Sequence, residues 1–62
     1  MTREAWVKWA RARYESLAAI SAEAADEART QAGLPEVWSW TSLRAQDAYR
    51  LSITCQIRLL DV

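Results

Sequence analysis

Residues with reactive side chains are few in this 62-residue sequence, which contains one cysteine, Cys55, and no histidine. A cysteine nucleophile needs a base to deprotonate it, and that base is most often histidine. Because Cys55 also falls in the middle of an apolar pattern, we predict that it is a small buried core residue. One cysteine cannot form an internal disulfide, and without histidine a structural zinc site has almost no ligands.

Glu23, Asp26 and Glu27 form the densest acidic cluster of the chain. On a helix, Glu23 and Glu27 would stand one turn apart with Asp26 alongside, and paired carboxylates can bind a divalent cation or share a proton. Nothing nearby completes a ligand set, so a solvated acidic face is favoured. Gly33 is the only glycine, so no glycine-rich loop can cradle a phosphate group. We therefore expect a protein that is not an enzyme and uses neither a metal nor a cofactor.

The stretch "REAWVKWARAR", residues 3–13, interleaves basic and aromatic residues as nucleic-acid-binding segments often do. Binding to a phosphate backbone requires cations on one face, but at about 100° per residue the four cations of this stretch point in different directions: Arg3, Lys8, Arg11 and Arg13. The net charge is also zero. Nucleic-acid binding therefore remains only an alternative.

The same stretch contains no apolar run suited to a signal peptide or a membrane span, and the patch of Trp6, Val7 and Trp9 is too short for an interfacial helix. We expect no membrane association and a cytoplasmic location.

The acidic cluster and the basic and aromatic residues of the first half all lie between Thr2 and Ala32, so the element formed by this stretch positions them. This stretch has neither glycine nor proline and is rich in alanine, which predicts one helix over residues 2–32 with Thr2 as its cap. Gly33 supplies the left-handed residue that ends many helices, Leu34 the accompanying apolar contact, and Pro35 blocks continuation.

The second half of the chain allows two interpretations. In residues 49–59, "YRLSITCQIRL", apolar and polar residues alternate as in a half-buried strand, which would give an α+β fold with a long N-terminal helix and a C-terminal strand or hairpin. Wound as a helix, the same segment has two apolar stripes and one polar face. The only candidate partner strand, "VWSWT", is joined through "SLRAQDA", which lacks a turn signal. We therefore predict a helix from Thr41 to Leu60.

These elements predict an all-α fold: a single domain over residues 1–62, formed by an antiparallel helical hairpin. A chain this short is marginally stable alone, and a hairpin would leave the second stripe of residues 41–60 uncovered. We expect a homodimer forming a four-helix bundle, with Ile53, Ile57 and Leu60 at its interface. The net charge is +3 over residues 1–14, −4 over 15–36 and +1 over the remainder, which suits antiparallel pairing of two copies.

Tryptophans suggest where a further partner would bind. On the helix predicted over residues 2–32, Trp6 lies at the centre of the apolar face and is assigned to the core. Trp9 lies at the edge of that face. Trp38 and Trp40 follow the turn; either they fold over the open end of the hairpin, or one stays exposed and binds a partner with Arg44 at the rim. We expect a protein-interaction module, such as a phage or bacterial regulator or inhibitor, that docks on a larger protein through Trp38, Trp40, Arg44 and Trp9. The other alternative is a purely structural homodimer.

Overall fold

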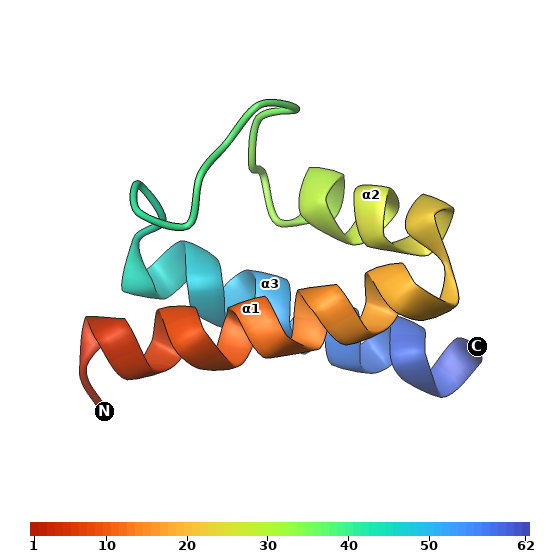
Figure 1. Cartoon of the computed structure of the whole chain (residues 1–62), viewed down its shortest axis with the longest axis horizontal. Helices are drawn as coiled ribbons and strands as arrows, with labels where there is room; N and C mark the ends of the chain where they lie inside the picture. The colour runs from red at the N-terminus through yellow and green to blue at the C-terminus, as the bar shows by residue number, and fades with distance from the viewer.

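The computed structural model describes residues 1–62 and consists of three helices without a strand: α1 Arg3–Ile20, α2 Ala22–Gln31 and α3 Ala45–Asp61 (Figure 1). The all-α prediction is confirmed. The strand alternative for residues 49–59 is wrong because α3 covers the whole segment. Alternation alone could not distinguish a strand from a helix, since the same residues wound as a helix place Leu51 and Cys55 on one buried stripe.

The predicted continuous helix over residues 2–32 is wrong, because the helix is interrupted at Ser21. This residue has extended backbone angles, φ −153° and ψ 110°, and its Oγ accepts a hydrogen bond from the Ala24 N–H at 3.2 Å. Its own N–H donates to the Leu17 carbonyl at 2.8 Å. Ser21 therefore ends α1 and caps α2 at the same time. A serine side chain can replace a helical partner in this way.

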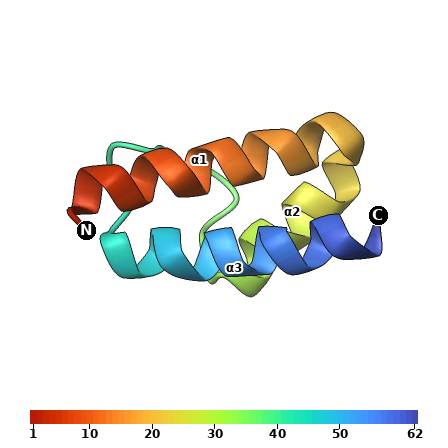
Figure 2. The same cartoon turned by 90° about the horizontal axis from the view of Figure 1, so that it is seen from below.

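The interruption at Ser21 reverses the direction of the chain. After Ser21 the chain turns back, so α2 runs opposite to α1, and the connection over residues 32–44 returns the chain to the start of α1 (Figures 1 and 2). As a result α1 and α3 lie side by side and parallel. The predicted antiparallel pairing of two long helices is therefore replaced by an additional reversal and a parallel α1–α3 pair.

The end of α2 matches the predicted stop signal. Gly33 has a φ of +79°, its N–H donates to the Thr30 carbonyl at 3.0 Å, and the Leu34 N–H donates to the Arg29 carbonyl at 3.2 Å. This is the paired hydrogen-bond pattern of a Schellman motif. Arg29 is buried, and its Nη1 donates to the Leu34 carbonyl at 2.9 Å. Its guanidinium thus holds the first residues of the connection against α2.

The start of α3 lies four residues later than predicted, at Ala45 rather than Thr41. The Arg3 guanidinium donates to the carbonyls of Thr41, at 3.1 Å, and of Leu43. These carbonyls therefore bind a side chain of α1 instead of forming a helical turn. Arg3 joins the beginnings of α1 and α3.

The core consists of two small clusters, a smaller one between α1 and the start of α3 and a larger one where all three helices meet. One contains Ala10, Leu43 and Ala48, and the other contains Leu17, Ala25, Ala28, Ala32, Leu51 and Cys55. Most of these side chains are small, and only 11 of the 62 residues are buried. The domain therefore gains little from burial within one chain.

Candidate functional site

One side of the α1–α3 layer has no helix packed on it. In Figure 2 the two helices lie nearest the viewer, and α2 and the connection lie behind them. At about 100° per residue, Tyr49 and Leu60 lie about 160–180° around α3 from Arg58, whose guanidinium pairs with Glu27 of α2. Tyr49 and Leu60 therefore face the open side.

Four large apolar side chains of α3 are exposed on this side, at spacings of one helical turn: Tyr49 (46%), Ile53 (37%), Ile57 (55%) and Leu60 (83%). The prediction that α3 carries a second apolar stripe, separate from its core stripe, agrees with this placement. The interface residues named from the sequence, Ile53, Ile57 and Leu60, all belong to it. Their role in dimerisation is still a prediction.

Aromatic residues of α1 continue the stripe across the seam. Trp6 meets Tyr49 edge to face with ring centroids 4.9 Å apart, and Trp9 lies 5.3 Å from Trp6. The Arg13 guanidinium stands 5.7 Å from the centre of the Trp9 ring, within cation–π range. We define the open face as these exposed or half-buried residues of the two helices: Trp6, Trp9, Tyr49, Ile53, Ile57 and Leu60. It combines the aromatic and aliphatic side chains typical of protein interfaces.

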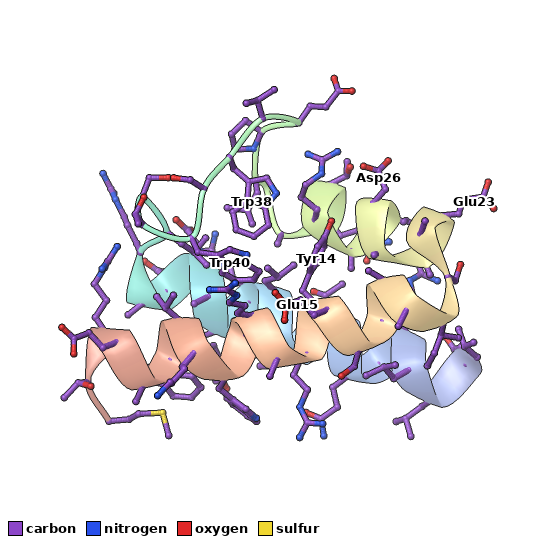
Figure 3. All side chains as sticks on the ribbon, viewed as in Figure 1. Tyr14, Glu15, Glu23, Asp26, Trp38 and Trp40 are labelled. Carbon is purple, nitrogen blue, oxygen red and sulfur yellow. The ribbon has the colours of Figure 1, made fainter.

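Trp38 and Trp40 lie on the opposite side of the layer. Both rings point from the connection toward α1, where Tyr14 meets them (Figure 3), with ring centroids 5.7 Å from Trp38 and 6.0 Å from Trp40. Their own centroids are 4.3 Å apart, and both pack against the two core clusters. Both rings are half-buried and meet edge to face, with 74° between their planes, and they close the core beneath the connection. This packing agrees with the first of the two alternatives set by the sequence, and partner binding by the exposed part of either ring stays a prediction.

The other partner-binding residues predicted from sequence are not gathered with this pair. Arg44 precedes α3, is exposed, and its side chain forms no hydrogen bond or ion pair. Trp9 belongs to the open face instead. The structure therefore divides the predicted set between two sides of the α1–α3 layer.

The acidic cluster of α2 is tied to neighbouring cations. Asp26 pairs with Arg29 at 2.7 Å, and Glu27 pairs with Arg58 of α3. Glu23 and Asp26 point away from the helix layer (Figure 3). No three carboxylate or thiol side chains come together as metal ligands. Of these carboxylates, Glu27 helps to fix α2 relative to α3, whereas the Asp26–Arg29 pair lies within α2.

Cys55 is completely buried in the larger core cluster, as predicted. Burial raises the pKa of its thiol to about 11, because desolvation disfavours the thiolate. The thiolate is the reactive form of cysteine. At neutral pH this side chain is a protonated apolar group of the core.

The basic residues of α1 are less dispersed than predicted, because three of the four line one hollow. Arg3 binds carbonyls of the connection, Arg11 pairs with Glu15 at 2.9 Å on an exposed surface, and Arg13 lies over Trp9. A hollow of about 500 Å³ beside Trp40 is lined by Arg3, Lys8 and Arg11, together with Glu4. Because Arg3 and Arg11 already have partners, Lys8 is the one unpaired cation of this hollow.

None of the three helices combines the length and the apolar character that crossing a membrane requires. Comparisons with protein-family models, curated proteins and solved structures give no match.

Sequence reasoning did not include Tyr49 and Trp6 in the interaction surface. The available signal for Tyr49 is its i, i+4 spacing to Ile53, which places it on the same stripe of α3. Trp6 was assigned to the core, which it contacts with one part of its ring. Its contact with Tyr49 depends on the parallel pairing of α1 and α3, which follows from the break at Ser21.

Proposed function

We propose that this protein is a non-enzymatic protein-interaction module whose contact surface is the open face. The observation that supports the proposal is the continuous row of exposed apolar side chains on α3 beside the Trp6–Trp9 pair. Single exposed apolar residues are common on soluble proteins, but a contiguous patch indicates an interaction site. Trp and Tyr are also among the residues that contribute most to binding energy.

The chemistry of the remaining residues supports the same class of function. The thiol is buried and protonated, two of the three clustered acidic residues are ion-paired, and most of the cations of α1 already have partners. The folded chain thus offers a shaped apolar surface rather than a reactive group. A regulator or inhibitor acting by docking needs only such a surface.

Ile57→Glu tests the proposal, with Ala19→Glu as its matched control. Ile57 lies at the middle of the exposed stripe, whereas Ala19 is exposed on the side of α1 that faces away from α3. A glutamate at position 57 would be desolvated without a partner in any complex that covers the open face. Both variants should retain the helical circular dichroism spectrum of the parent chain.

The measurement is complex formation by the tagged chain, by sedimentation of the purified protein and by capture from lysate of the source cell. We expect complexes of the parent and of Ala19→Glu that Ile57→Glu does not form. If Ile57→Glu forms the same complexes in the same amounts, the open face is not the contact surface. If the parent chain forms no complex of any kind, the proposed function is wrong.

A further inference from the structure

We propose that part of the open face is occupied by a second copy of this chain, with α3 of the two copies packed antiparallel about a twofold axis near position 55. The inference rests on the proposed function, because it names one occupant of the proposed surface. It is carried by the arrangement of apolar and charged residues along α3.

The apolar stripe of α3 is symmetric about its centre. Twofold symmetry requires that if residue i meets residue j of the other copy, then j also meets i. Ile53 pairs with Ile57 under this rule, and Tyr49 pairs with Leu60. The midpoint of each pair falls within half a residue of position 55, which is about 0.8 Å along a helix that rises about 1.5 Å per residue. One axis therefore brings all four side chains into reciprocal apolar contact.

Charges at the edge of the stripe follow the same symmetry. Arg50 and Asp61 are three helical turns apart, so they lie on the same edge of α3, next to Ile57. The midpoint of this pair also falls within half a residue of position 55. In the antiparallel dimer, Arg50 of each copy stands opposite Asp61 of the other.

Neither of these charged residues has a partner within the chain. Both are exposed, and the three ion pairs of the protein involve other residues. A parallel twofold pair would place this edge of the two copies on opposite sides of the interface, so Arg50 and Asp61 would gain no partner there. Charge complementarity thus favours the antiparallel orientation, in the way that edge charges set orientation in other helix pairs.

The small core gives a reason for the second copy to be needed. The fully buried side chains of the chain include no aromatic residue, and the largest of them are Leu17 and Leu51. Chains of this size commonly obtain the missing apolar burial from oligomerisation. Packing α3 against α3 would remove Ile53 and Ile57 from water in both copies.

Charge reversal tests the inference in the full chain. Arg50→Asp places two like charges opposite each other at both ends of the interface, and Asp61→Arg does the same with opposite sign. By sedimentation equilibrium from about 10 µM to about 500 µM, the parent chain should be a reversible dimer. Each single variant should dimerise about tenfold more weakly, because symmetry applies each change twice.

Two combinations should restore association. The double variant R50D/D61R regains both opposite-charge contacts, and an equimolar mixture of the two single variants forms a heterodimer in which both contacts are attractive. Each should approach the parent affinity at low salt, and the differences should shrink in about 1 M salt. Circular dichroism shows whether every variant keeps its helices.

The inference is overturned if the parent chain is monomeric throughout the concentration range. It is also overturned if the single reversals leave dimerisation unchanged, which would indicate a parallel pairing or a different surface. In either case, loss of another complex by Ile57→Glu but not by Ala19→Glu would still support the interaction module itself. Failure of the second-copy inference and failure of the proposed function are therefore distinguishable.

Discussion

Replacing Trp38 with alanine should destabilise the protein strongly, although the ring is only half-buried. The indole meets Tyr14 and Trp40 and packs against both core clusters. Burying a whole tryptophan removes roughly 200 Å² from water, which at about 25 cal/mol per Å² gives an upper estimate of about 5 kcal/mol. Allowing for the exposed part of the ring, we expect a loss of about 3 kcal/mol.

That loss is comparable to the total stability of a domain of this size, which is about 3–5 kcal/mol without disulfides or metals. About 3 kcal/mol corresponds to a fall in melting temperature of about 12–24 °C, at about 4–8 °C per kcal/mol. Thermal and urea unfolding followed by circular dichroism at 222 nm measures the change directly, and we expect the variant to be partly unfolded before denaturant is added.

Val37→Ala is the matched control, because Val37 is the neighbouring residue and is 90% exposed. Its stability should stay within about 0.5 kcal/mol of the parent. If Trp38→Ala and Val37→Ala melt alike, Trp38 does not close the core. Its assignment as a partner-binding residue would then regain support.

Three further predictions concern the two ends of α2 and the buried thiol. Ser21→Ala removes the cap of α2 and should cost about 1 kcal/mol in thermal unfolding, whereas Ser16→Ala, inside α1, should cost nothing. Gly33→Ala forces alanine to adopt a φ of +79° and should cost about 1 kcal/mol, with Gly33→Asn losing less. Between about pH 9 and pH 11 the unfolded chain releases the Cys55 proton that the folded chain keeps. The free energy of unfolding should therefore fall as pH rises, by at most about 1.4 kcal/mol per pH unit. Below pH 9 this contribution is absent, and in urea unfolding Cys55→Ala should lack it at every pH. If the free energy of unfolding falls equally with pH in both chains, the fall does not come from Cys55.

Much of the local structure could be predicted from residue types. Alanine-rich composition and the apolar stripes predicted helices, and Gly33 with Leu34 predicted how the second of them ends. The exposed stripe of α3 was also predictable, because two apolar stripes on one helix cannot both face the same neighbour.

The direction of the helices could not be predicted, and the reason is Ser21. Serine is only mildly unfavourable inside a helix, and the glutamate of a capping box is missing here because position 24 is alanine. The break depends on contacts between α2 and α3, including the ion pair of Glu27 with Arg58, which are distant in sequence. The placement of the Trp38–Trp40 pair likewise depends on a residue distant in sequence, Tyr14 of α1.

The parallel pairing of α1 and α3 affects how the chain folds. In a helical hairpin the two helices meet through residues close to the turn, so closure begins with short loops. Here Arg3 meets the carbonyl of Leu43, 40 residues away in a chain of 62. The main seam can form only after α2 and the connection have brought the chain back, which costs loop-closure entropy early. High contact order slows folding, so this protein should fold more slowly than helical hairpins of equal length and stability.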